Sequence, residues 1–365
     1  MALMWSVLLY SIVIFVMTVA TGRISTFETK SIRYSGYTLI SGIASLVPAF
    51  RGLTGTDTAM YKTVYLYGDA AYTRWSDIEK GYIAINNFFQ KFLPLPAFFF
   101  LVSFVTIYLY LLSIDSFRDR IDMYVAAFIL FTGNYLLSMN IMRQMLAVSI
   151  CLFAMVKYLE GKKILPFVLF IIATNIHTSA VLCVLFIVLD ILLTKYQSRS
   201  LAIIIVAVVL LLTVNYVQIG NIILRFTGNK YYAGYFTRSA FTGGSFISYY
   251  LKNSPILIVI CLYIYQYRQN RPFFVMFVAL LVGYMMASIG AVVDTQVGRI
   301  GYYFTAFSSI VLGFCSKYDA ILQFDGRNIV IRTNVIKTMV YIYYILNLIS
   351  MFGHNYAELL PYGLS

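Results

Sequence analysis

Two side chains that are unfavourable in hydrocarbon lie close together in this sequence, and both are of types that do chemistry. Arg143 stands at the head of an apolar run that ends in the basic turn 160–163, and His177 stands in the next apolar run. Ionisable residues inside membrane segments are rare and are typically functional. If two helical segments join Arg143 to His177, both residues lie on one membrane face. The functional prediction depends on what else shares that face.

The composition is that of a membrane protein. Hydrophobic residues make up 61% of the chain and charged residues 11%, and the mean hydropathy is +0.82. That leaves too little polar surface to cover a soluble domain. About twelve apolar runs of membrane-helix length predict an all-α polytopic protein, with residues 1–365 forming one integral membrane domain.

The net charge of +13 does not predict nucleic-acid binding, because the basic residues are scattered through short loops. Basic loops on the cytoplasmic side and contact with anionic lipid headgroups explain them better. The four cysteines lie inside apolar runs without a CxxC pair, which is typical of small core residues.

Basic loops also predict the topology. Arg23, Lys30 and Arg33 follow the first apolar run, so that connection is expected to be cytoplasmic and residues 51–93 to form an extracytoplasmic loop with amphipathic segments. The run 164–193 is long for one helix and short for two, and we interpret it as two shortened helices that meet at 177–179. A single tilted helix is the alternative, and it would invert the sidedness of everything downstream.

With the broken helix, residues 217–253 form a second extracytoplasmic loop, which is basic and contains no Asp or Glu. The outer face then collects the following charged residues and one histidine: Arg51, Asp57, Asp69, Asp77, Glu79, Arg143, His177, Arg225, Arg238 and Arg299. The planar fork of arginine suits bidentate contact with phosphate, and aromatic faces suit sugar rings. This face therefore predicts a site for a phosphorylated, sugar-bearing lipid, although most of the 32 tyrosines are explained by a membrane aromatic belt.

Each of these residues also has a purely structural interpretation. Asp57 could cap a helix, Arg143 could snorkel to the membrane interface, and His177 could bond a neighbouring backbone group. The pair Asp77 and Glu79 resembles a two-carboxylate metal site, but no further ligand clusters with it, and one histidine does not make a zinc site. No metal and no cofactor are predicted.

Taken together and in order, the motifs resemble a known family. The chain reads Arg51-Gly-x-x-Gly55-Thr-Asp57-Thr-x-x-Tyr61, then Glu79-x-Gly81-Tyr82, then Arg143-Gln144-x-x-Ala147, then His177-x-Ser179-Ala180. This set is similar to the EpsG family of exopolysaccharide proteins, which belongs with the Wzy-type O-antigen and capsule polymerases. Arg299-x-x-Tyr302-Tyr303 resembles the later arginine–aromatic element of that family. The family's glutamate-proline-glycine type of element reads Glu79-Lys80-Gly81 here, and this departure leaves the role of Glu79 open.

The resemblance implies a membrane glycosyltransferase with an all-helical, GT-C-like fold and no nucleotide-sugar domain. The implied activity is polymerisation of polyprenyl-diphosphate-linked oligosaccharide repeat units at the outer face of the cytoplasmic membrane of a bacterium. The implied partners are membrane lipid, a chain-length regulator and a flippase, without nucleic acid.

The chemistry of a glycosyl diphosphate assigns roles to the candidate residues. The donor already carries a good leaving group, so the enzyme needs cations around the departing phosphate oxygens and a base near the acceptor hydroxyl. Arg143, Arg51 and Arg299 are the predicted phosphate contacts, and either Asp57 or His177 is the predicted base. The predicted substrate-binding set is completed by Gln144, Tyr61, Glu79, Tyr303, Arg225 and Arg238.

Two other functions use similar features. An O-antigen-ligase-like transferase needs the same donor chemistry and differs only in its acceptor. A transporter or flippase of the lipid-linked unit would have charges distributed through its spans and internal repeats, whereas Asp190 is the one acid deep in a predicted span and no repeat is visible.

Overall fold

The computed structural model describes residues 2–68, 78–196, 245–292, 298–324 and 327–363, with a few single residues between 197 and 244. In this part of the chain eight helices are long and apolar enough to cross a membrane. The fold is therefore all-α and polytopic, as predicted. The count of about twelve spans stays a prediction, because most of residues 197–244 lie outside the described part.

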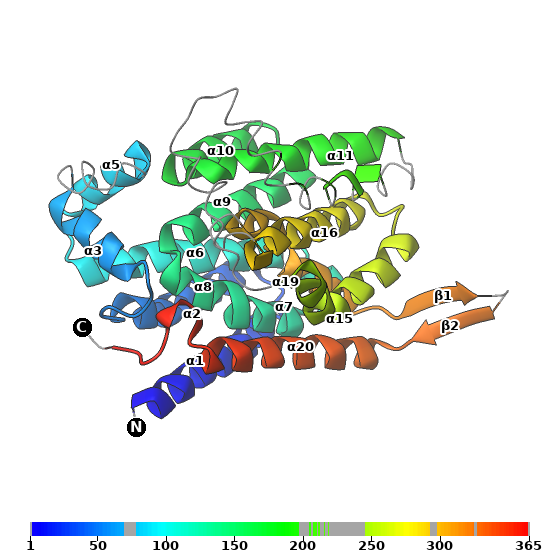
Figure 1. The fold of residues 1–365 in the computed structure, drawn as a ribbon, viewed down its shortest axis with the longest axis horizontal. Helices are drawn as coiled ribbons and strands as arrows, with labels where there is room; N and C mark the ends of the chain where they lie inside the picture. The colour runs from blue at the N-terminus through cyan, green and yellow to red at the C-terminus, as the bar shows by residue number, and fades with distance from the viewer. Residues whose placement is uncertain are drawn as a thin grey trace. The chain divides into compact units, whose positions relative to one another are not determined.

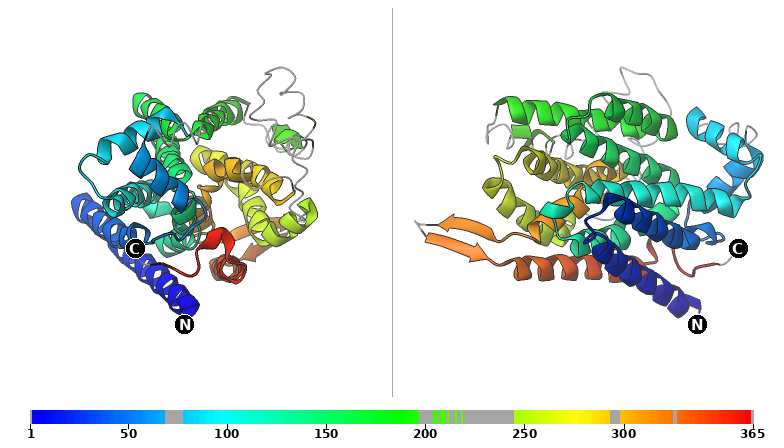
Figure 2. Two further views of the ribbon diagram at one scale, coloured as in Figure 1. Left: turned by 60° about the vertical axis from the view of Figure 1, so that its left-hand side comes forward. Right: turned by 180° about the vertical axis from the view of Figure 1, so that it is seen from behind.

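The chain divides into two compact units. The first comprises residues 1–181, 308–319 and 332–365, and the second comprises residues 182–307 and 320–331. The first unit is a helical bundle in which α6 packs on both α2 and α9, and α9 packs on α10 (Figures 1 and 2). Its elements are α1 (Ala2–Ile24), α2 (Lys30–Ala49), α3 (Thr58–Tyr67), α5 (Lys80–Phe89), α6 (Leu95–Asp115), η1 (Arg118–Arg120), α7 (Met123–Ile129), the π-helical η2 (Leu130–Asn134), α8 (Tyr135–Asn140), α9 (Met142–Leu159), α10 (Ile164–Ile176), the start of η3 (Thr178–Cys183), α19 (Ser308–Cys315), α20 (Thr333–Gly353) and η5 (Tyr356–Glu358).

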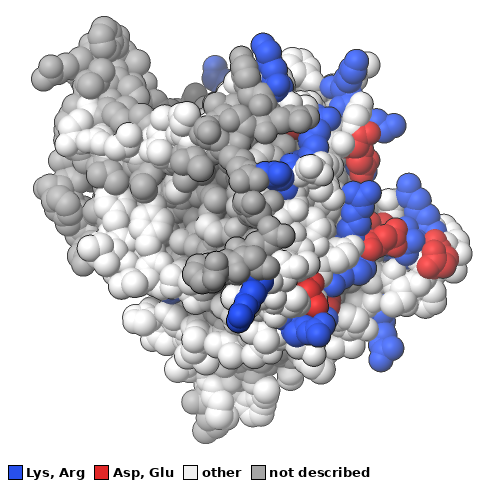
Figure 3. Space-filling model, turned by 90° about the vertical axis from the view of Figure 1, so that its right-hand side faces the viewer, with Lys and Arg blue, Asp and Glu red and all other residues white. Residues whose placement is uncertain are grey.

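One end of the first unit is rich in ion pairs that join the ends of neighbouring helices. Arg33 at the start of α2 pairs with Asp115 at the end of α6 at 3.1 Å, and Lys337 of α20 pairs with Asp122 at 2.6 Å. Lysines and arginines gather with acidic side chains on one face of the molecule (Figure 3). The 18 residues of α9 separate this charged end from Arg143 by about 27 Å.

The predicted break in the run 164–193 is confirmed. Helix α10 ends at Ile176, His177 takes an extended backbone conformation with φ −150° and ψ 114°, and α11 begins only at Val184. A polar residue followed by two hydroxyl residues interrupts the apolar run at this point, and such residues compete with helical backbone hydrogen bonds.

The segment after α20 returns to the loop 51–57. The N–H groups of Gly55 and Thr56 donate to the carbonyl oxygens of Glu358 and Ala357 at 3.0 and 3.2 Å. The N–H of Gly363 donates to Oγ1 of Thr54 at 2.9 Å. Residues about 300 positions apart in the sequence are thus hydrogen-bonded to each other.

The second unit contains α11 (Val184–Tyr196), α15 (Phe246–Gln266), α16 (Arg271–Val292), η4 (Arg299–Gly301), α18 (Tyr302–Thr305) and the strands β1 (Ala320–Phe324) and β2 (Arg327–Ile331). Helix α16 packs on α11, α15, η4 and α18. The two strands form an antiparallel hairpin that pairs Ala320 with Ile331, an element not predicted from the sequence.

Two predicted features of the second unit can be compared with the structure. Asp190, the acid predicted deep in a span, is 1% exposed and forms two hydrogen bonds with Arg271 at 2.9 and 2.6 Å. Helix α15 begins at Phe246, where Oγ of Ser245 accepts a hydrogen bond from the N–H of Ser248, so the last eight residues of the predicted loop 217–253 are helical. The remainder of that loop lies outside the described residues, apart from Gln218 and Ser245.

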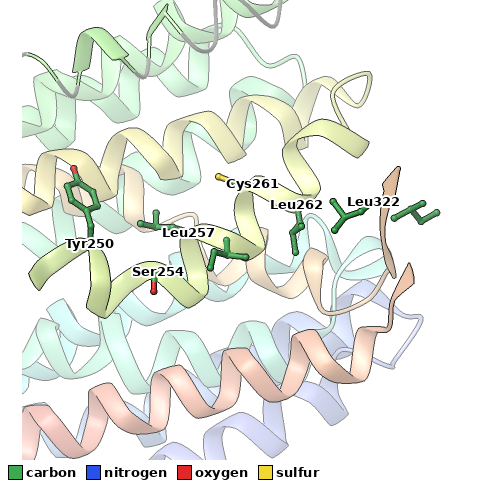
Figure 4. A pocket seen from close by; sticks show the side chains of 8 residues that line it. Tyr250, Ser254, Leu257, Cys261, Leu262 and Leu322 are labelled. Atoms are coloured by element: carbon green, nitrogen blue, oxygen red, sulfur yellow. The ribbon is translucent and has the colours of Figure 1, made fainter. Parts of the chain in front are cut away.

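A hollow of about 760 Å³ lies between α15 and β1 (Figure 4). Leucine and isoleucine side chains from both elements form most of its wall, with Tyr250, Ser254 and Cys261 as the polar or sulfur-bearing members. None of the described residues that line it is charged, so this part of its wall supplies no cation for a diphosphate group.

Candidate functional site

The loop 51–57 holds the break between α8 and α9. A guanidinium nitrogen of Arg51, Nη1, donates to the carbonyl oxygen of Met139. Oδ1 of Asn140 accepts hydrogen bonds from Oγ1 of Thr56 at 2.7 Å and from the N–H of Asp57 at 3.1 Å. The last carbonyls of a helix have no partner within the helix. The loop supplies partners at the end of α8 and thereby fixes the residue at which α9 begins.

Gly55 is required in this loop. Its φ is +95°, a region that other residues rarely adopt, and a Cβ at this position would lie 2.9 Å from the carbonyl oxygen of Met139. The motif around Asp57 therefore carries glycine because its backbone approaches the end of α8 closely.

Arg51 does not have the geometry predicted for a phosphate contact. Arg51 is 0% exposed. Its guanidinium lies 4.6 Å from the centre of the Phe99 ring, and its Nη2 lies 3.7 Å from Sδ of Met142. No carboxylate among the described residues pairs with it, and burial lowers its pKa to about 10. Nη1 of Arg51 holds the end of α8, where a cation is favourable, whereas its buried Nε has no hydrogen-bond partner among the described residues.

Arg143 lies in the first turn of α9 and is held by two neighbouring elements. Its Nη1 forms an ion pair with Oε2 of Glu79, the residue that precedes α5. Its backbone N–H lies 3.4 Å from the hydroxyl of Tyr61, and its guanidinium lies 5.7 Å from the centre of the Tyr82 ring. The side chains of Arg143 and Glu79 are 12% and 13% exposed.

The other oxygen of Glu79 holds the break after α10. Oε1 of Glu79 lies 3.1 Å from Nδ1 of His177 and accepts a hydrogen bond from the N–H of Thr178 at 2.7 Å. Glu79, Arg143 and His177 therefore form a continuous cluster, which we call the Glu79 cluster. One carboxylate joins the N-terminal ends of α5 and α9 to the C-terminal end of α10.

The Glu79 carboxylate is ionised over the whole physiological pH range. Burial alone would raise its pKa, but the hydrogen bond with His177 and the charge of Arg143 outweigh burial and lower it to about 2. The stabilisation that this anion gives to the site is fully present at neutral pH and is lost only as the pH falls through the folded-state pKa.

Gly81 allows α5 to approach the end of α10. A Cβ at Gly81 would lie 2.5 Å from the carbonyl oxygen of Asn175 and 2.8 Å from its Cβ. Both distances are shorter than van der Waals contact, and the first neighbour is backbone that cannot move aside cheaply. This packing explains the glycine two residues after Glu79.

We expect Gly81→Ala to push the start of α5 away from α10 and to separate Glu79 from Thr178. The amide of Thr178 should then exchange with deuterium faster, which mass spectrometry of a peptide covering residues 172–182 would measure. Gly42→Ala is the matched control, because no atom lies within 4 Å of a Cβ there. Unchanged protection in the Gly81 variant would contradict this account of the packing.

The structure brings seven of the predicted site residues together in the first unit. They are Arg51, Asp57, Tyr61, Glu79, Arg143, Gln144 and His177. Arg299 and Tyr303 belong to the second unit, where the turn before Tyr302 lies close to α16, since a Cβ at Gly301 would be 2.5 Å from the carbonyl oxygen of Gly283. Arg225, Arg238, Asp69 and Asp77 lie outside the described residues.

Sequence reasoning missed how Glu79 is used. It placed Glu79 on one face with Arg143 and His177 and predicted it as a substrate-binding residue whose role was open, but it did not predict that Glu79 contacts both of them. The sequence did carry a signal for this contact. Arg143 stands at the start of one apolar run and His177 at the interruption of the next, so both lie at helix ends, where one carboxylate can reach both. Within the described residues, no group of three or more His, Cys, Asp or Glu side chains could hold a metal ion.

Comparison with known proteins gives one match. A family model described as the EpsG family matches residues 34–364, which is nearly the whole chain. No curated protein and no solved structure matches the chain significantly.

Proposed function

This chain belongs to the EpsG family, whose members are Wzy-type polymerases, and we propose that it joins lipid-linked oligosaccharide repeat units into a surface polysaccharide. The donor in this proposal is a polyprenyl-diphosphate-linked glycan, and the acceptor is the free sugar end of an incoming unit. The reaction takes place at the outer face of a bacterial cytoplasmic membrane, with a chain-length regulator and a flippase as partners.

The Glu79 cluster is the observation that carries this proposal. It combines a cation for phosphate, an imidazole and a surrounding set of tyrosines, which is the equipment that transfer from a glycosyl diphosphate needs. Arg143 also stands in the first turn of α9, where the helix N-terminus favours an anion.

The charges at the two ends of the first unit support the proposed sidedness. The end of the first unit that is remote from Arg143 contains several ion-paired basic residues, namely Arg33, Arg118 and Lys337. Basic residues are enriched on the cytoplasmic side of membrane proteins. The Glu79 cluster at the opposite end therefore faces the exterior, where the lipid-linked units are polymerised in this proposal.

The reaction forms one bond and breaks one. The acceptor hydroxyl oxygen attacks the anomeric carbon of the donor sugar while the bond from that carbon to the diphosphate oxygen breaks, and the bonding electrons leave with the polyprenyl diphosphate. The hydroxyl proton passes to Nε2 of His177. Arg143 stabilises the negative charge that develops on the departing diphosphate.

His177 is the better placed of the two candidate bases. Its Nδ1 lies on Glu79, so the tautomer with the proton on Nδ1 leaves Nε2 as the acceptor. The backbone N–H of Asp57 is bonded to Asn140, and its side chain lies 3.3 Å from the hydroxyl of Thr56. Asp57 thereby contributes to the loop that fixes the start of α9.

A reconstituted reaction tests the proposal. The purified protein in detergent is given lipid-linked repeat units, and the products are separated by size. A ladder of longer glycans on the carrier lipid is expected. Transfer of glycan to a different acceptor without lengthening would identify a ligase. The absence of any new glycosidic bond would indicate a carrier. Either result would overturn the proposal. The pairing of Asp190 with Arg271 leaves that acid engaged, which disfavours a transport path through it.

A further inference from the structure

The cation assigned to the donor diphosphate is already occupied by an anion. Nη1 of Arg143 lies against Oε2 of Glu79, and both side chains are nearly buried. Because Glu79 engages Nη1, a diphosphate that binds Nη1 and Nη2 of Arg143 in the fork-like manner typical of arginine must compete with this carboxylate for Nη1. Arg143 can therefore bind the diphosphate through Nη1 only after its contact with Glu79 is broken.

The same carboxylate has a second set of contacts that the diphosphate does not need to disturb. Oε1 of Glu79 contacts Nδ1 of His177 and the N–H of Thr178, on the side of α10. The two oxygens of Glu79 thus serve two different elements. Loss of the contact with Arg143 leaves the contacts with the α10 end available.

We propose that Glu79 is a positioning residue with two separable actions, namely that it occupies Arg143 until the donor diphosphate displaces it and that it fixes the ring of His177 through Nδ1. The inference rests on the proposed function of the site, and it adds a role that neither the family nor the sequence pattern assigns. Glu79 makes donor binding weaker and proton transfer faster.

These two actions have opposite signs in kinetics. A pairing that is formed in about nine molecules of ten reduces the apparent affinity for a competing anion about tenfold. Removing the negative charge should therefore tighten donor binding. The same removal leaves His177 without the acceptor for its Nδ1 proton and without the anion that stabilises the imidazolium formed during the reaction, which should slow the rate.

Glu79→Gln is the variant that separates the two actions. Glutamine is nearly isosteric with glutamate and keeps hydrogen-bonding capacity, but it has no charge to hold Arg143. We expect undecaprenyl diphosphate to bind purified Glu79→Gln protein about tenfold or more tightly than wild type, and kcat for polymerisation to fall while KM for the donor falls as well.

Matched controls use a second carboxylate and a second ligand. Glu160→Gln removes the same charge from the opposite end of α9, where Glu160 pairs with Lys157, and should leave binding unchanged. Undecaprenol, which lacks the diphosphate, should bind wild type and Glu79→Gln equally. Inorganic pyrophosphate should show the same preference as undecaprenyl diphosphate, because the competition is for Arg143 and not for the lipid chain.

The charge of Glu79 also determines how the difference in donor affinity depends on pH. Because the pKa of Glu79 is held at about 2, its charge does not change at higher pH. Glu79 itself should therefore add no pH dependence to the ratio of the two affinities between about pH 5 and 8.

The proposal fails if undecaprenyl diphosphate binds Glu79→Gln no more tightly than wild type, or if kcat is unchanged. If Glu79→Gln does not fold, Glu79→Asp replaces it, because aspartate keeps the charge but is one methylene shorter and reaches Arg143 less well. The donor affinity and kcat should then shift in the same directions as in Glu79→Gln, but by less. An unchanged donor affinity in Glu79→Asp would overturn the proposal. Binding of undecaprenyl diphosphate is measured without turnover. The effect of Glu79 on binding is therefore tested separately from the question whether the protein polymerises repeat units.

Discussion

Arg143→Ala is expected to reduce the rate of polymerisation by about 10²- to 10³-fold while the protein remains in the membrane. The guanidinium of Arg143 and the imidazole of His177 contact the same carboxylate in the Glu79 cluster. Loss of the guanidinium removes charge stabilisation from the departing diphosphate and leaves Glu79 without its partner. The rate is measured as glycan lengthening by purified protein, and the amount of protein in membranes is measured by immunoblot.

Three further variants separate chemistry from folding. The double variant Arg143→Ala with Glu79→Gln removes the orphaned carboxylate as well and should remain inactive, because the cation is still missing. Arg143→Lys keeps a charge but loses the planar fork and should be intermediate. Arg120→Ala, at an exposed position of η1, should polymerise normally. Normal chain length in Arg143→Ala would remove this residue from the mechanism.

His177→Asn is expected to lower kcat by about 10²- to 10⁴-fold, the usual contribution of a positioned acid–base group. Asparagine can still donate toward Glu79, but it provides no basic nitrogen on the side where Nε2 stands. Any dependence of the wild-type rate on pH between about 5 and 8 that arises from the imidazole should be absent in the variant. Single-turnover kinetics on donor-saturated protein measure this step.

Asp57→Asn provides the comparison for the base. If Asp57 acts only through the loop that holds Asn140, its side-chain charge is dispensable and the rate should change by much less than in His177→Asn. A larger loss in Asp57→Asn than in His177→Asn would reverse the assignment of the base.

The long apolar runs predicted the class of fold, and the polar interruption at His177 predicted the break after α10. Both features depend on residues that are adjacent in the sequence, because a membrane helix satisfies its backbone hydrogen bonds within one segment. The position of Arg143 at the head of an apolar run was also predicted, and α9 begins at Met142. Features of this local kind can be predicted from sequence without knowledge of tertiary contacts.

The contacts that assemble the site could not be predicted in the same way. Arg51 holds a carbonyl oxygen 88 residues away, and Glu79 contacts residues 64 and 98 positions away. Burial of Arg51 conflicts with the ordinary preference of arginine for water or an anion, so its side chain was expected at a phosphate. The β-hairpin, in contrast, carried a local signal that was overlooked, because Asp325-Gly326 stands between two apolar stretches and this dipeptide favours tight hairpin turns.

The hydrogen bonds between residues 54–56 and 357–363 have a consequence for biosynthesis. The loop that fixes the start of α9 leaves the ribosome early, whereas its partners emerge only after α20. A nascent chain therefore carries Arg143 and His177 in the membrane long before the loop 51–57 forms these hydrogen bonds. Competence to bind donor should arise only after residues 357–363, which follow α20, have been released from the ribosome.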